Sequence, residues 1–149
     1  MRLSGVEYQL RTRPFRSTEF ILAHSMIDRR ADDDKLRLNV APYTASLSWL
    51  QEIGPWNSML SVLRMGPIDA GFSYAPGFNS SVPAYTTVDW SVARRFRMRE
   101  TELEVRLSGI NLLGKHLELV NRLRQSQSST YQPVNEVGRQ VYLSLQTQF

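Results

Sequence analysis

Residues that could bind a metal ion or act in catalysis are few and widely spaced in this chain. The 149 residues include no cysteine and two histidines, His24 and His116. Neither histidine has further ligands at the spacing of a zinc site, so we expect no metal centre. Asp32, Asp33 and Asp34 offer oxygen ligands for calcium, but the run lacks the glycine and the terminal glutamate of a dedicated loop. We expect this acidic run to lie in a solvated loop.

No catalytic motif stands out either. The sequence shows no serine, histidine and aspartate arrangement, no phosphate-binding loop and no pair of carboxylates placed for acid–base chemistry. The lack of cysteine also excludes a thiolate metal site, a cysteine nucleophile and a disulfide framework. We therefore expect a protein that is not an enzyme and that carries no cofactor.

Charge and hydropathy exclude further classes of protein. The formal net charge is +4, but the arginines are interspersed with carboxylates, as around residues 94–104, so we expect no nucleic-acid partner. Hydrophobic residues make up 42% of the chain, which excludes a disordered protein. No apolar run reaches the length of a membrane-spanning helix. The length suits one domain, residues 1–149.

Alternation of apolar and polar residues is the dominant pattern, and it predicts β-strands with one apolar and one polar face. Pro14 is expected to end the first such run. Two further segments, 17–29 and 56–65, have strand composition with weaker alternation. We therefore expect an all-β, antiparallel fold of seven strands. The clear alternating runs cover residues 6–13, 43–49, 88–97, 102–108 and 140–149.

The lengths of the links between these strands favour a membrane protein. Membrane β-barrels have short periplasmic turns and long external loops, and the short and long links of this chain alternate strictly. Strands of about 9 to 12 residues also match a bilayer better than the usual globular strands of about 5 to 6. We therefore expect part of an antiparallel transmembrane β-barrel, because seven meandering strands alone cannot close. The short links are 13–16, 52–55 and 98–100, and the long links are 30–42, 66–85 and 113–138.

The same alternation assigns the charged residues to faces. Arg94 falls on the apolar face, close enough to a strand end for its side chain to reach the membrane interface. Ile110 and Leu112 have the parity of the polar face, which predicts a β-bulge at Gly109. The other charged strand residues would point into a barrel lumen. These are Glu7, Arg11, Arg95, Arg97, Glu102, Glu104 and Arg106.

Several motifs cluster in the last third of the chain. They are Val82–Asp89, Leu103–Lys115 with its ending Asn-Leu-Leu-Gly-Lys, Tyr131–Pro133 and Gly138–Phe149. Together they resemble the C-terminal barrel of TonB-dependent outer-membrane receptors. In that family a similar threonine-containing strand leads to a long strand ending in Asn-Leu-Phe-Asp-Lys, and a proline-glycine-arginine loop precedes the last strand. Leu113, Gly114 and Thr147 depart from the family pattern.

The resemblance implies a function and a location. TonB-dependent receptors take up scarce ligands, such as ferric siderophores or corrinoids, across the outer membrane with energy from the inner membrane. It implies a barrel of about 22 strands around a plug, of which these strands would be roughly the last third. The expected partners are outer-membrane lipid, the barrel assembly machinery, the remainder of the barrel and the plug. The lumen charges would contact substrate or form ion pairs against that plug.

Parts of such a receptor are not recognised in residues 1–149. We find no counterpart of the plug domain or of the N-terminal segment that contacts TonB. No signal peptide is recognised after Met1 either. TonB would therefore be reached only through a part of the receptor outside this sequence.

The last strand carries a candidate assembly signal. Val141, Leu143 and Leu145 recur at period 2 before the terminal Phe149. This ending resembles the signal that the outer-membrane assembly machinery reads, because it offers an apolar, one-faced edge that ends in an aromatic. Phe149 would equally serve as an aromatic residue of the membrane interface.

Two other interpretations stay open. The chain could be a soluble antiparallel β-sheet binding protein, in which the alternating apolar faces pack into a dry core. It could also be a truncated gene product without an independent function, since no export signal is recognised.

Overall fold

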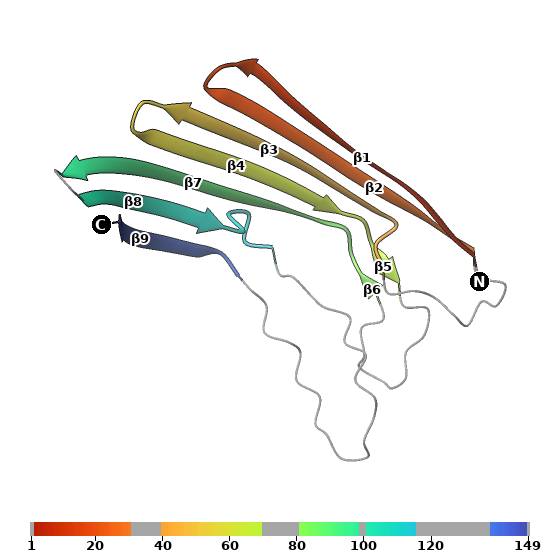
Figure 1. The fold of residues 1–149 in the computed structure, drawn as a ribbon. Coiled ribbons are helices and arrows are strands. Elements are labelled where there is room, and N and C mark those ends of the chain that lie inside the picture. Colours follow the sequence, from red (N-terminus) through yellow and green to blue (C-terminus); the bar gives the residue numbers. More distant parts are fainter. Residues whose placement is uncertain (1, 31–39, 70–80, 99–100, 116–137, 149) are drawn as a thin grey trace, which may run out of the picture.

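The computed structural model describes residues 2–30, 40–69, 81–98, 101–115 and 138–148, which form an all-β structure (Figure 1). Seven strands make one antiparallel sheet, and the short strands β5 (Ile68–Asp69) and β6 (Ser81–Val82) pair separately. The all-β class and the seven-stranded antiparallel sheet are therefore confirmed. The strands of the main sheet are β1 (Arg2–Phe15), β2 (Thr18–Arg30), β3 (Tyr43–Ile53), β4 (Trp56–Met65), β7 (Tyr85–Met98), β8 (Thr101–Ile110) and β9 (Gln140–Gln148).

The main sheet is a meander with two free edges. Its strand order is β1-β2-β3-β4-β7-β8-β9, so each strand pairs with the next strand of this sheet along the chain. β1 and β9 each have one paired neighbour, and the described strands are not closed into a barrel. None of the described residues belongs to a helix that is long and apolar enough to cross a membrane.

Tight turns lie at one end of the sheet. Arg16 and Ser17 link β1 to β2, and Gly54 and Pro55 link β3 to β4. Gly54 has a φ of 56°, and proline fixes a negative φ at the next position, which is the combination of a type II′ hairpin turn. The facing ends of β7 and β8 lie at the same end of the sheet (Figure 1). The strand ends that the short links join therefore lie at one end of the sheet, and those that the long links join lie at the other, as predicted.

The register sorts the side chains onto two faces. Residues directly opposite each other in an antiparallel pair point to the same side of the sheet. One row of such partners joins Leu22, Leu47, Val62 and Val88 across four strands. We call the side with this row the apolar face and the opposite side the polar face. The apolar face carries the even-numbered residues of β2, β4, β7 and of β1 up to Thr12, and the odd-numbered residues of β3, β8 and β9.

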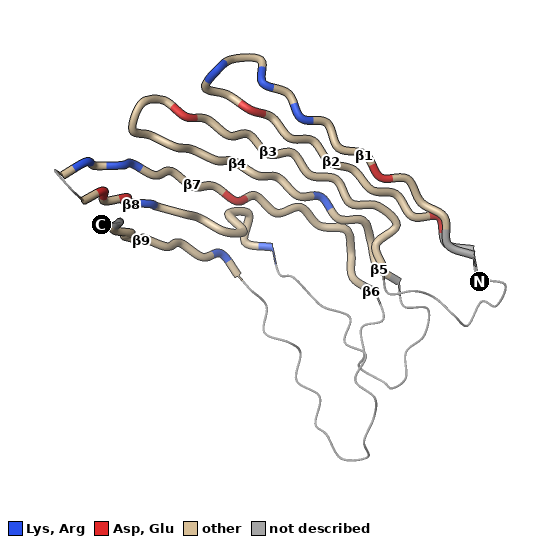
Figure 2. Tube along the Cα trace, in the orientation of Figure 1, with Lys and Arg blue, Asp and Glu red and all other residues tan. Residues whose placement is uncertain are grey.

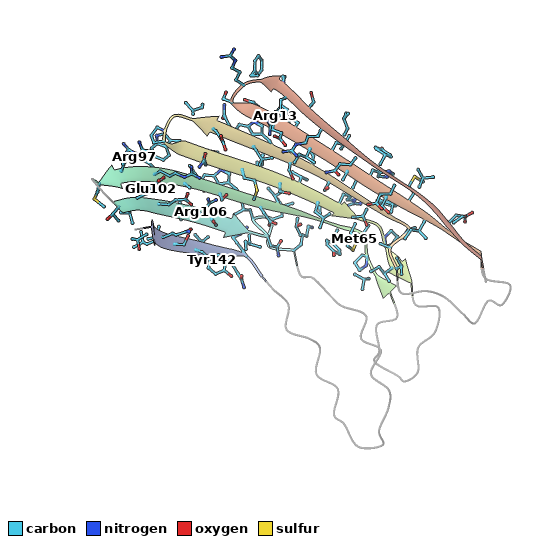
Figure 3. All side chains as sticks on the ribbon, viewed as in Figure 1. Arg13, Met65, Arg97, Glu102, Arg106 and Tyr142 are labelled. Atoms are coloured by element: carbon cyan, nitrogen blue, oxygen red, sulfur yellow. The ribbon has the colours of Figure 1, made fainter. Side chains whose placement is uncertain are left out.

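No second layer of described residues covers the apolar face. Figure 3 shows side chains extending from both sides of a single sheet. Among the described residues, the buried hydrophobic side chains are Ala41, Val82 and Ala93. Water-soluble proteins rarely leave a contiguous apolar surface of this extent exposed. The exposed large apolar residues of this face are Val6, Tyr8, Leu10, Phe15, Leu22, Met26, Leu47, Ile53, Trp56, Phe96, Met98, Leu107, Val141, Leu143 and Leu145.

The first strand does not end at Pro14, contrary to the sequence-based prediction. β1 continues to Phe15, which pairs with Thr18, and the register shifts between Thr12 and Phe15. Proline is tolerated here because the irregular pairing leaves room for a residue without an N–H group. The pair of β5 and β6 is likewise not predicted, because two-residue strands are too short to show alternation.

The β-bulge predicted at Gly109 is wrong. Gly109 pairs regularly with Trp90 on one side and with Val141 on the other. The backbone leaves the strand two residues later, at Asn111, where φ is 50°. The side chain of Leu112 lies over Gly109, and a Cβ atom on Gly109 would lie 2.6 Å from Leu112 Cδ2. The glycine therefore makes room for a side chain.

This contact gives a first test. We expect Gly109→Ala to lower the free energy of unfolding by about 1 kcal/mol, because the added methyl group displaces Leu112. In a Leu112→Ala background the same substitution should have little effect, since the clashing atoms are gone. Urea unfolding in lipid vesicles, followed by tryptophan fluorescence, measures both effects. An equal loss of stability in the two backgrounds would show that the contact with Leu112 is not the reason for glycine at position 109.

Candidate functional site

The polar face holds the charged residues that the alternation assigns to it. Their strand partners place all of them on this side of the sheet, as predicted. Figure 2 shows charged residues gathered toward the end of the sheet where the tight turns lie. The predicted lumen residues are distributed as Glu7 and Arg11 on β1, Arg95 and Arg97 on β7, and Glu102, Glu104 and Arg106 on β8.

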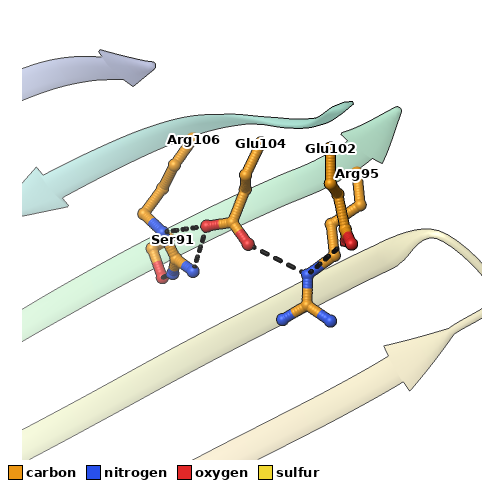
Figure 4. Close-up of polar contacts among 5 residues, drawn as sticks. All are labelled: Ser91, Arg95, Glu102, Glu104 and Arg106. Atoms are coloured by element: carbon orange, nitrogen blue, oxygen red, sulfur yellow. Dashed lines mark hydrogen bonds and ion pairs between the residues drawn. The ribbon is translucent and has the colours of Figure 1, made fainter. Parts of the chain in front are cut away.

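Glu104 is the centre of an ion cluster on β7 and β8 (Figure 4). Its carboxylate accepts hydrogen bonds from Arg95 Nε at 3.1 Å and from Arg106 Nη2 at 2.7 Å. Arg95 also lies 3.8 Å from Glu102 Oε1, and Arg106 Nη1 donates to Ser91 Oγ at 3.5 Å. The register explains the cluster, because Arg95 stands directly opposite Glu104. The Glu104 side chain is 16% exposed, so its ion pairs are partly shielded from water.

Glu19 is the centre of a second ion cluster, beside the turn between β1 and β2. Its carboxylate accepts hydrogen bonds from Arg11 Nε and, at 2.6 Å, from Arg13 Nε. Of these three residues, only Arg11 is among the predicted lumen residues. A regular hairpin continued from the Phe15–Thr18 pair would place Glu19 opposite Pro14, and it is the register shift between Thr12 and Phe15 that brings Glu19 to the face of Arg11 and Arg13.

The two clusters leave hydrogen-bond donors exposed on the polar face. Each central carboxylate is shared by two arginines. The described residues include no group of three or more histidine, cysteine or acidic side chains that could hold a metal ion. The side chains of Arg11 and Arg13 are 60% and 66% exposed, so N–H groups not used by Glu19 remain accessible. The polar face can therefore offer hydrogen bonds and positive charge to a partner that lies against it.

Asn111 fixes the backbone where β8 ends. It is 2% exposed, and its N–H donates to Asp89 Oδ1 at 2.8 Å. Its side-chain amide donates to the Lys115 carbonyl at 2.7 Å and accepts from the Lys115 N–H at 3.1 Å. Asparagine is one of the few residues other than glycine that tolerates a positive φ. The Asn-Leu-Leu-Gly-Lys segment is therefore a closed loop that leads out of the sheet in a fixed direction.

The histidines and the acidic run do not form a described site. His24 lies on the apolar face, where its ring centroid is 5.3 Å from that of Tyr8. No metal-ligand group of described residues includes it. His116 and the run Asp32-Asp33-Asp34 lie outside the described residues.

β9 presents the predicted assembly residues along a free edge. Val141, Leu143 and Leu145 lie on its apolar face and are 65%, 70% and 68% exposed. Phe149 lies outside the described residues. Among the described strands β9 pairs with β8 alone, so no described strand occupies the backbone groups of its other edge. The expected one-faced apolar edge is present, and its role in assembly stays a prediction.

No protein-family model, curated protein or solved structure matches the chain. The resemblance to TonB-dependent receptors therefore depends on the quoted sequence motifs alone. The structure adds an open, two-faced antiparallel sheet with ion clusters on its polar face.

The cluster on β7 and β8 can be tested by removing each carboxylate in turn. Glu104→Ala should lower the free energy of unfolding by about 1 kcal/mol more than Glu102→Ala, because two arginines then lose their shielded partner. Glu102 is the matched control, since its side chain is 40% exposed and only 3.8 Å from Arg95. Urea unfolding in lipid vesicles measures the difference. Equal effects of the two substitutions would contradict the central position of Glu104.

Proposed function

We propose that this chain forms part of the wall of an outer-membrane β-barrel. The observation that carries the proposal is the exposed apolar face, which extends over seven strands while the ion clusters lie on the opposite face. An apolar face of this kind needs either a second protein layer or lipid against it. Among the described residues there is no second layer, so we assign lipid to the apolar face and the lumen to the polar face.

The length of the apolar face supports this assignment. On β7 the part of the apolar face between Thr86 and Arg94 is about 27 Å long at about 3.4 Å per residue. At a tilt of about 40° this corresponds to about 20 Å along the membrane normal, compared with an apolar band of about 25 Å in known barrels. The charged side chains described on this face, Asp28, Arg64 and Arg94, lie toward the ends of their strands. Charge is thus kept out of the middle of the face.

The open edges also fit a wall segment. A free strand edge in lipid leaves backbone groups unpaired at several kcal/mol each. β1 and β9 run in the same direction because they are separated by five antiparallel strands of the main sheet. An antiparallel barrel would therefore need an odd number of further strands to join these two edges. We propose that strands other than these seven supply them.

We further propose that the barrel is that of a TonB-dependent receptor for a siderophore-like or other scarce ligand. The support is the resemblance of the last third of the chain, including the Asn111–Lys115 segment that leads out of β8. On this proposal the outer-membrane lipid, the assembly machinery, the remainder of the barrel and the plug are the partners. The exposed arginines of the polar face would then bind the plug or the substrate.

A matched pair of substitutions in the middle of β4 tests the wall. Val62 lies on the apolar face and Ser61 on the polar face, side by side on one strand. Val62→Arg should make insertion into phosphatidylcholine vesicles less favourable by about 2–4 kcal/mol, because it puts a charge on the lipid-facing side of the strand. Ser61→Arg should be tolerated. Insertion is measured as the fraction of chain that vesicles protect from protease.

The soluble alternative makes the opposite prediction for the unmodified chain. A monodisperse monomer with a cooperative thermal transition in detergent-free buffer would contradict the barrel wall and favour a soluble binding protein. The receptor assignment is tested separately by the DNA upstream of Met1. An in-frame continuation that encodes a plug and a leader supports it, whereas a stop codon and a ribosome-binding site there favour the truncated gene product.

A further inference from the structure

Arg94 is a charged residue on the apolar face, as the sequence alternation predicts. It pairs with Trp56 of β4 on one side and with Val105 of β8 on the other. Its neighbour Phe96 lies two residues along β7 on the same face. Arg94 therefore stands among side chains that, on the proposed function, face lipid.

The aromatic neighbours hold the guanidinium group in place. Arg94 Cζ lies 5.1 Å from the ring centroid of Trp56 and 4.7 Å from that of Phe96. Both distances are within the range of cation–π interactions, which become stronger where water is excluded. Two rings thus fix a group whose side chain would otherwise be free to move.

The described protein supplies no acceptor for the N–H groups of Arg94. Among the described residues no carboxylate forms an ion pair with it, whereas Arg95 and Arg106 on the other face share Glu104. The second arginine of the apolar face, Arg64, donates to Thr86 Oγ1 at 3.1 Å. Guanidinium N–H groups beside an apolar surface need acceptors, because leaving them unpaired is costly. Arg94 therefore requires an acceptor from outside the described chain.

We propose that Arg94, held by Trp56 and Phe96, binds the phosphate of an anionic phospholipid headgroup. This rests on the proposed function, since it requires the apolar face to lie in lipid. Trp56 directly follows the turn at Gly54 and Pro55, so the site lies toward the turn end of the apolar face, where β4 begins. Phosphate is the acceptor that a membrane offers at this level, and its oxygens match the planar fork of arginine. The site belongs to the leaflet on the side of the tight turns.

The test uses Trp56 as the reporter. In a chain with Trp49→Phe and Trp90→Phe, the fluorescence of Trp56 is quenched by brominated lipids in contact with it. We expect brominated phosphatidylglycerol to associate about five-fold more strongly than brominated phosphatidylcholine, as one arginine near an anionic lipid predicts. Arg94→Gln should abolish this preference, and Arg64→Gln, at the other end of the face, should leave it unchanged.

The outcomes separate this proposal from the proposed function. If neither brominated lipid quenches Trp56, the apolar face is not in lipid and both proposals are wrong. If both lipids quench Trp56 equally, or if Arg94→Gln keeps the preference for phosphatidylglycerol, the proposed barrel wall is still supported and the proposed phosphate site is wrong. Excess inorganic phosphate in the buffer should leave the preference unchanged. A loss of preference under that condition would assign the site to free phosphate and overturn the lipid assignment.

Discussion

The structure depends on one constraint, the alternation of side chains kept in register across seven strands. A slip of one residue in any strand pair would exchange the two faces of that strand. From β2 to β9 the described pairs of the main sheet keep a constant register, and the shift between Thr12 and Phe15 lies at the edge strand. The apolar face is therefore continuous from one edge of the sheet to the other. No described side chain has to cross to the wrong side to keep the pairing.

The charged residues are divided between the same two faces, and on each face they also lie at particular positions along the strands. On the polar face, Glu19 and Glu104 each bring two arginines together close to the tight turns. On the apolar face, Arg64 and Arg94 stand at opposite ends of the paired strands β4 and β7. A sheet sorted in this way suits two different surroundings, one apolar and about as thick as a bilayer core, and one polar. This sorting is the physical basis for proposing a barrel wall with a lumen.

The alternation predicts the strands and the faces well, because a period of two is a direct consequence of strand geometry. It does not predict the pairing at Pro14, since the proline is tolerated because of the register shift between Thr12 and Phe15. The bulge predicted at Gly109 fails for a similar reason, because the glycine makes room for the side chain of Leu112 and does not change the path of its own backbone. Glu19 becomes visible only once the hairpin register brings it to Arg11 and Arg13. Features set by contacts between distant residues are thus the ones that the pattern leaves out.

The measurement that tests the central claim most directly is the solvent accessibility of β9, residue by residue. The chain has no cysteine, so single cysteine substitutions from Val141 to Thr147 each place one nitroxide label. In lipid vesicles the account predicts high accessibility to oxygen at the odd-numbered positions and high accessibility to a water-soluble nickel complex at the even-numbered positions. Equal accessibility along the strand, or the opposite phase, would contradict a wall with lipid on its apolar face.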